Sequence, residues 1–122
     1  EKMGNQTSST FSCLEDSAVA TGSIKKMRAV IYDDYGGANV MKLGTVPVPK
    51  PLPTQLLVRV KAASINPIDV KRREGGLKQM QKESFPVTLG YDVSGEVIEV
   101  GAQAGDFKVG DQIFARVDQR AS

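Results

Sequence analysis

The sequence predicts a small, mainly β fold, which we expect to be an antiparallel barrel or sandwich. Five or six short runs of residues have strand character, and segments rich in glycine and proline separate them. Little helix is expected, and a short helical turn could begin at or after Pro67. With 122 residues, the chain is long enough for at most one domain. No internal repeat is visible in it.

Composition and charge describe an ordinary soluble globular chain. Hydrophobic residues make up 40% of it and charged residues 25%. The net charge of +2 gives no strong attraction to nucleic acid or to an acidic membrane. No run approaches the roughly 20 apolar residues of a transmembrane segment. Histidine is absent and Cys13 is the only cysteine, which excludes an internal disulfide and a usual zinc site and fits an intracellular location.

The first segment, residues 1–26, is polar and rich in serine and threonine, and it has neither a helical nor a strand periodicity. Such a composition buries too little apolar surface to fold, so we expect residues 1–26 to be a disordered leader. Its serine content is typical of organelle-targeting peptides, but Glu15, Asp16 and the lack of arginine argue against an intact one. We expect the folded domain to occupy residues 27–122.

Strand patterns recur after the leader. The first run ends at the glycine-rich turn 33–37. Four alternating prolines between positions 47 and 53 predict a stiff, extended connector, with a polyproline ligand as the alternative. Gly95, inside a later strand, is tolerable at a bulge or a close backbone approach. The predicted strands are residues 28–32, 40–46, 55–63, 93–101 and 112–117.

The loop after the third strand carries side chains that are capable of chemistry. Pro67 cannot donate to a sheet and disfavours a helical conformation at Asn66, so the strand should stop near Asn66. Asn66, Asp69 and Lys71 then lie at a strand end, where loops held by a rigid scaffold commonly carry function. A capped surface turn without chemistry is the alternative.

Basic residues are frequent between residues 67 and 82. One interpretation is a solvated surface, which suits most of them. The other is a patch that meets an anionic group, such as the phosphate of a cofactor. The residues are Lys71, Arg72, Arg73, Lys78 and Lys82.

Seven motifs follow one another along the chain: Met27-Arg28-Ala29-Val30, Tyr35-Gly36-Gly37, Val46-Pro47-Val48-Pro49, Leu57-Val58-Arg59-Val60, Ser64-Ile65-Asn66-Pro67-Ile68-Asp69, Pro86-Val87-Thr88-Leu89-Gly90-Tyr91-Asp92-Val93-Ser94-Gly95 and Val109-Gly110-Asp111. In this order they resemble the N-terminal, GroES-like catalytic domain of the medium-chain dehydrogenase/reductase superfamily. The resemblance covers residues 27 to about 117. It implies a mainly β, partly open barrel with short helices that is incomplete at its C-terminal end, because the family returns to this domain with later strands.

Within the superfamily, the chain resembles the zinc-free quinone oxidoreductase branch and its plastid alkenal (enone) reductases. Zinc-dependent members have a cysteine ligand where Asn66 falls and a Gly-His-Glu motif where Gly90-Tyr91-Asp92 falls. Neither zinc ligand is present, so no metal residue is assigned. The resemblance implies hydride transfer from NADPH to a conjugated carbonyl or quinone, with a hydrogen-bond donor at the developing enolate oxygen.

The resemblance also implies site residues. Lys71 and Tyr91 are the candidate catalytic donors, because their segments line the substrate cleft in the family. Asn66 matches the cofactor-binding residue that faces the nicotinamide. The alternatives are a surface lysine, a half-buried tyrosine with a satisfied hydroxyl, and a turn residue bonded to its own backbone. We interpret Asp69 and Asp92 as residues that hold loops in place.

The family binds NADPH on a separate doubly wound domain with a glycine-rich turn, and no segment here has that spacing. We therefore expect the cofactor (Rossmann) domain to be absent from this chain. The 122 residues alone should be inactive, should not bind NADPH tightly and should carry no zinc.

The predicted partner is the missing C-terminal cofactor domain, or another protein chain that caps the exposed sheet edge in a larger assembly. The alternative function is a non-catalytic GroES-like subunit of such an assembly. The resemblance implies an intracellular location, the chloroplast, with the mitochondrion and cytoplasm as alternatives.

Overall fold

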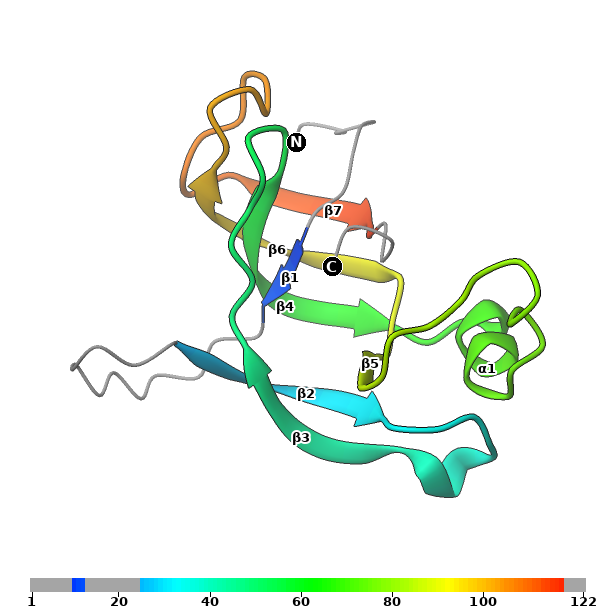
Figure 1. Cartoon of the computed structure of the whole chain (residues 1–122). Coiled ribbons are helices and arrows are strands. Elements are labelled where there is room, and N and C mark those ends of the chain that lie inside the picture. Colours follow the sequence, from blue (N-terminus) through cyan, green and yellow to red (C-terminus); the bar gives the residue numbers. More distant parts are fainter. Residues whose placement is uncertain (1–9, 13–24, 118–122) are drawn as a thin grey trace.

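The computed structural model describes residues 10–12 and 25–117, which form two β-sheets and one short α-helix (Figure 1). One sheet has four strands in the order β1-β4-β6-β7, and the other has three in the order β3-β2-β5. The elements are β1 (Thr10–Ser12), β2 (Lys26–Tyr32), the 3-10 helix η1 (Ala38–Val40), β3 (Lys42–Pro47), β4 (Leu56–Ser64), α1 (Pro67–Arg73), β5 (Val87–Thr88), β6 (Asp92–Val100) and β7 (Gln112–Arg116).

The predicted fold class is confirmed. The described part is mainly β, and the two sheets do not close into a barrel (Figure 1). No helix in this part of the chain is long and apolar enough to cross a membrane.

The antiparallel pair β4–β6 forms the centre of the larger sheet. Its register runs from Leu56 opposite Val100 to Ser64 opposite Asp92, with irregularities between Leu57 and Val58 and between Val60 and Ala62. Along β6, buried and half-buried residues alternate over most of the strand. This period of two is typical of a strand with one face on the core.

The hydrophobic core lies on one face of this sheet. Its buried members come from β4, β6 and β7, which are adjacent strands. Branched aliphatic side chains on neighbouring strands pack well on the pleated surface, so the strand pattern and the core reinforce one another. The core residues are Leu56, Val58, Val97 and Ile113.

The smaller sheet is built around β2. This strand pairs antiparallel with β3 over residues 26–31 and with β5 at Ile31 and Tyr32. Met27, Ile31 and Tyr32 are buried, whereas Val30 is exposed. The connector after β3, residues 48–52, lies outside helix and strand.

Two parts of the structure differ from the prediction. Thr10–Ser12, which lie within the predicted disordered leader, form the strand β1. This strand pairs in parallel with Leu57–Arg59 of β4. This pairing uses the backbone groups on the edge of β4, and it therefore needs no side-chain pattern that the sequence would reveal. The remainder of the leader, apart from residues 25 and 26, lies outside the described residues. β2 begins at Lys26, one residue before the predicted domain boundary.

Candidate functional site

The loop between β4 and α1 has the predicted form. β4 ends at Ser64, and Asn66 has an extended conformation with φ −120° and ψ 162°. Pro67 is the first residue of α1, a position that suits proline because the first amide of a helix has no intrahelical partner. The predicted strand end and helix start are therefore confirmed.

The side chain of Asn66 joins this loop to the start of β6. Its amide Nδ2 donates to Asp92 Oδ2 at 2.6 Å and to Ser64 Oγ at 3.2 Å. Ser64 and Asp92 are also opposite one another in the β4–β6 register. Asn66 and the segment that carries Tyr91 are consequently brought together at one end of the sheet.

The two aspartates hold these loops in place, as interpreted from the sequence. Asp69 is 1% exposed, and its Oδ2 accepts a hydrogen bond from the backbone N–H of Asn66 at 2.7 Å. This bond satisfies a donor at the helix N-terminus that would otherwise lack a partner. Asp92 accepts the bond from the Asn66 amide, which fixes that side chain.

Lys71 lies in α1, five residues after Asn66, and is exposed. Its ammonium group forms no ion pair with the residues that the structure describes. The structure thus places a cation with three hydrogen-bond donors on the exposed surface of α1, five residues after Asn66.

Tyr91 is buried beside two arginines. The guanidinium carbon of Arg72 lies 5.3 Å from the centroid of the Tyr91 ring, and that of Arg116 lies 5.6 Å from it. Both distances fall within the range of cation–π contacts. The Tyr91 carbonyl accepts from the backbone N–H of Val117 at 2.6 Å, which ties the residue to the segment after β7.

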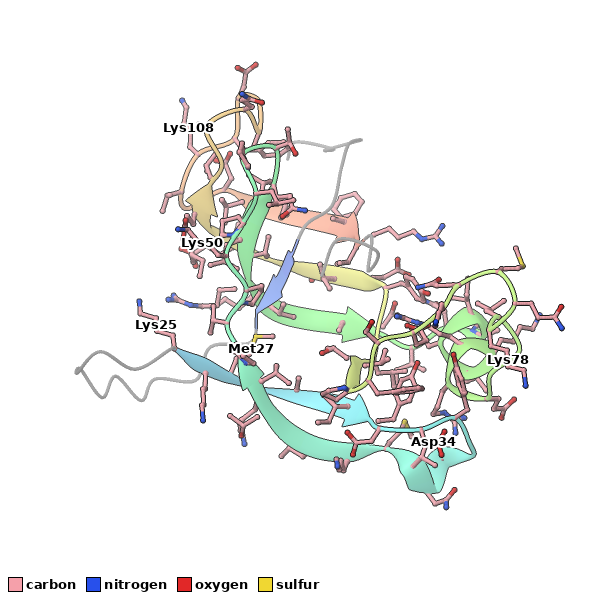
Figure 2. All side chains as sticks on the ribbon, in the orientation of Figure 1. Lys25, Met27, Asp34, Lys50, Lys78 and Lys108 are labelled. Carbon is pink, nitrogen blue, oxygen red and sulfur yellow. The ribbon has the colours of Figure 1, made fainter. Side chains whose placement is uncertain are left out.

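The predicted basic patch divides into two groups. Arg72 and Arg73 are buried, with Arg72 forming a two-bond ion pair with Glu83 and Arg73 donating to the Gly36 carbonyl at 3.0 Å. Lys71, Lys78 and Lys82 remain exposed. Figure 2 shows side chains crowded between α1 and the end of β2, with Asp34 and Lys78 labelled on that side of the molecule.

Burial perturbs two groups here. Burial lowers the pKa of Arg72, but its hydrogen bonds to Glu83, together with the charge interactions with Tyr91, Glu83 and Tyr32, outweigh this effect, so the net pKa is raised. Burial of Tyr32 raises the pKa of its hydroxyl to about 12. That hydroxyl has no hydrogen-bond partner among the described residues. Sequence reasoning missed Glu83 and Tyr32, because no motif pairs either of them with Arg72.

Aromatic packing links the turn after β2 to the loop before β5. The ring of Phe85 meets Tyr32 edge-on with centroids 6.1 Å apart and Tyr35 with centroids 5.2 Å apart.

Within the described ranges, no group of three histidine, cysteine, aspartate or glutamate residues could hold a metal ion.

A partly open, mainly β fold whose strand-end loop after β4 meets the start of β6 is that of a GroES-like domain. The chain belongs to the alcohol dehydrogenase GroES-like domain family, whose model matches residues 52–121. This family lies within the medium-chain dehydrogenase/reductase superfamily, so the predicted membership is confirmed.

The relatives include quinone and alkenal oxidoreductases. The chain is 43% identical over 98 residues to an NADPH-dependent alkenal/one oxidoreductase, chloroplastic, from Arabidopsis thaliana, covering 80% of this chain and 25% of the relative. It is 40% identical over 92 residues to a chloroplastic quinone-oxidoreductase homolog from Spinacia oleracea, covering 75% and 28%. The chain therefore spans about a quarter of the length of the curated relatives it matches.

A solved structure shares the fold. The quinone oxidoreductase from Coxiella burnetii superposes with a TM-score of 0.69 at 41% sequence identity, covering 74% of this chain and 29% of that one.

Proposed function

We propose that this chain is the N-terminal substrate-domain portion of an NADPH-dependent, zinc-free oxidoreductase that reduces a conjugated carbonyl or a quinone. The observation that carries the proposal is the 2.6 Å hydrogen bond between Asn66 Nδ2 and Asp92 Oδ2. This bond joins the segment of Asn66 and Lys71 to the segment of Tyr91. The activities printed in the names of the Arabidopsis and Spinacia relatives support this reaction class.

The residues present fit a nicotinamide cofactor. Asn66 is half-buried with a side-chain amide fixed by Asp92, and Lys71 is an exposed cation five residues further along the chain. An amide and a cation on one loop-to-helix segment suit an anionic dinucleotide whose ring bears a carboxamide. Bound NADPH would supply a hydride to the substrate.

The role of the chain is then to stabilise charge on the substrate oxygen. When a conjugated carbonyl accepts a hydride at its alkene carbon, negative charge develops on the oxygen as an enolate. Lys71 donates from an ammonium and Tyr91 from a phenol, and a fixed donor at such an oxygen lowers the barrier. Asp69 and Asp92 hold Asn66, so the loop keeps its shape during the reaction.

The direct test uses the full-length protein with NADPH and a short-chain alkenal. We expect the saturated aldehyde, with deuterium from [4-²H]NADPH on the β-carbon and a solvent proton on the α-carbon. The rate should be insensitive to a zinc chelator. Formation of the unsaturated alcohol, or activity that returns only with added zinc, would contradict the proposal.

Donor variants test the assigned residues. Lys71→Met and Tyr91→Phe should each lower kcat by about 100-fold if they are oxyanion donors. Lys78→Met is the matched control, because Lys78 is an exposed lysine on the following loop. Equal activities in all three variants would exclude both residues from the chemistry.

The remaining proposals concern binding and location. The 122-residue chain alone should bind NADPH more weakly than micromolar, to be measured by calorimetry, and no zinc should copurify, to be checked by elemental analysis.

We propose that the cofactor domain or another protein chain covers the edge of β7. We also propose the chloroplast as the location, and a fluorescent fusion that accumulates outside plastids would contradict this.

A further inference from the structure

We infer that Arg72 is a positioning residue for Tyr91: held by Glu83, the Arg72 guanidinium fixes the Tyr91 ring and so sets the direction of its hydroxyl. The inference rests on the proposed function, in which that hydroxyl donates to the substrate oxygen. It adds a role for Glu83, a loop residue that no sequence motif connects to the site.

The Arg72–Glu83 pair is a rigid support. Arg72 Nε donates to Glu83 Oε1 at 2.6 Å and Nη2 donates to Oε2 at 2.7 Å. The two side chains are only 4% and 5% exposed. Two parallel bonds between planar groups fix both the position and the tilt of the guanidinium, which a single bond would not do.

The remaining guanidinium nitrogen of Arg72, Nη1, links the Arg72–Glu83 ion pair to Tyr91. Nη1 of Arg72 is buried and has no hydrogen-bond partner within the described part of the chain. A buried N–H group without an acceptor is costly unless another electron-rich group faces it. The guanidinium carbon lies 5.3 Å from the Tyr91 centroid, so the aromatic ring provides that negative surface.

Arg116 cannot perform the same task. Its guanidinium carbon lies 5.6 Å from the same centroid, but Arg116 is an exposed residue at the end of β7. A long exposed side chain with solvent around it samples many rotamers. Of the two arginines over the ring, only Arg72 forms a buried ion pair with a residue that the structure describes.

The contacts therefore form a chain from loop to site. Glu83 lies in the loop between α1 and β5, Arg72 lies in α1, and Tyr91 directly precedes β6. Shortening Glu83 or removing the fork of Arg72 should release the Tyr91 ring while leaving its phenol intact. A purely structural ion pair would affect stability without changing the environment of Tyr91.

The test compares Glu83→Asp and Arg72→Lys with Glu74→Asp in the full-length protein. The first two changes keep both charges but break the fork geometry, so at least one variant should fold. Glu74→Asp is the matched control, because Glu74 approaches Arg73 at 3.6 Å with a side chain that is 55% exposed. Incorporated 3-fluorotyrosine reports on each ring by ¹⁹F NMR, and the loss of one signal in Tyr91→Phe assigns Tyr91.

We expect the Tyr91 signal to move or split in Glu83→Asp and Arg72→Lys and to stay unchanged in Glu74→Asp. The kcat for alkenal reduction should fall by up to about 100-fold, as for an ångström-scale misplacement, with an unchanged KM for NADPH. An unmoved Tyr91 signal in a folded variant would overturn the inference.

The NMR measurement separates this inference from the proposed function. If Tyr91→Phe leaves alkenal reduction unchanged, the catalytic role of Tyr91 fails. In that case a moved signal in the Glu83 and Arg72 variants still supports the positioning of the ring, and an unmoved signal still overturns it.

Discussion

Arg72 and Glu83 show how this small domain keeps two opposite charges in its interior. Each side chain is almost completely buried, and two short hydrogen bonds join them. A buried pair of this kind compensates for the loss of hydration only while both partners are present. The pair therefore adds little net stability as a unit but makes the fold sensitive to the loss of either member.

Glu83→Gln should destabilise the fold by about 3–5 kcal/mol, because it leaves the Arg72 charge buried without compensation. The free energy of unfolding from urea titrations measures the effect. Asp33→Asn is the control: its ion pair with Lys42 is more than half exposed, so its loss should cost no more than about 1 kcal/mol. A loss for Glu83→Gln as small as that of the control would contradict this view of the buried pair.

Tyr32 predicts a loss of stability at alkaline pH. Burial raises its folded-state pKa from 10.0 to about 12. Above pH 10 the unfolded chain releases this proton while the folded chain retains it, so the unfolded state binds fewer protons and stability falls. The Tyr32 contribution should decline by about 1.4 kcal/mol per pH unit through the window from pH 10 to 12.

The difference between wild type and Tyr32→Phe isolates this contribution from other titrating groups. Because the hydroxyl is buried without a partner in the described part, the variant should be about 1 kcal/mol more stable at pH 7. The advantage should widen as the pH rises above 10. A constant difference from pH 8 to 11.5, measured by urea unfolding, would show that Tyr32 does not titrate as proposed.

At the scale of single residues, the sequence predicted the backbone conformation of the site better than the interactions of its side chains. Pro67 dictated where β4 stops and α1 begins, since its ring restricts both its own φ and the preceding residue. The Arg72–Glu83 pair could not be predicted, because the two residues are eleven positions apart across an irregular loop and no periodicity relates them. The roles of Asn66, Lys71 and Tyr91 stay predictions.

At the scale of elements, the β4–β6 pair depends on a close backbone approach at Gly95. A Cβ atom at this position would lie 2.1 Å from the Arg59 carbonyl oxygen. Gly95 is opposite Val60, beside the irregularity between Val60 and Ala62. The expectation that Gly95 marks a bulge or a close approach is thus confirmed.

Gly95→Ala should destabilise the fold by about 3 kcal/mol, because backbone atoms of β4 must move to admit the methyl group. Gly105→Ala provides a comparison. Gly105 has φ +81° but nothing lies within 4 Å of its added Cβ, so only the strained backbone contributes, about 1–2 kcal/mol. Thermal unfolding of both variants gives the order of their stabilities. A Gly95→Ala protein as stable as the Gly105→Ala protein would show that the added methyl group does not clash with the backbone of β4.

Strands with a core-facing pattern could be predicted, whereas elements defined by backbone pairing alone could not. β2, β4, β6 and β7 were found to within a few residues, because each is long enough to carry a strand pattern. Buried and more exposed residues alternate along most of β6 and β7, whereas β4 begins with three consecutive buried residues. β5 has two residues and β1 has three, which is too short for any periodicity. The 3-10 helix η1 was missed because the second strand was predicted to begin at Val40.

At the scale of the whole molecule, the larger sheet ends at β7. Within the described residues β7 pairs only with β6, so the backbone groups on its other side have no strand partner. Phe114, in the middle of β7, is 54% exposed. An edge strand that carries an exposed aromatic side chain is a template for pairing with another chain.

We therefore predict that the 122-residue chain, produced alone at about 10–100 µM, self-associates through β7. Phe114→Lys should restore a monomer, because a lysine on an edge strand opposes edge-to-edge pairing. Val109→Lys is the control: Val109 is 67% exposed but lies in the loop before β7, so its replacement should leave association unchanged. Sedimentation velocity distinguishes these cases.

In the full-length protein, a segment or partner over β7 should make the Phe114→Lys change destabilising instead, since it would bury the new charge. A 122-residue chain that is monomeric and unfolds cooperatively in dilute solution would show that β7 needs no cover, and would identify this chain as an independent small domain.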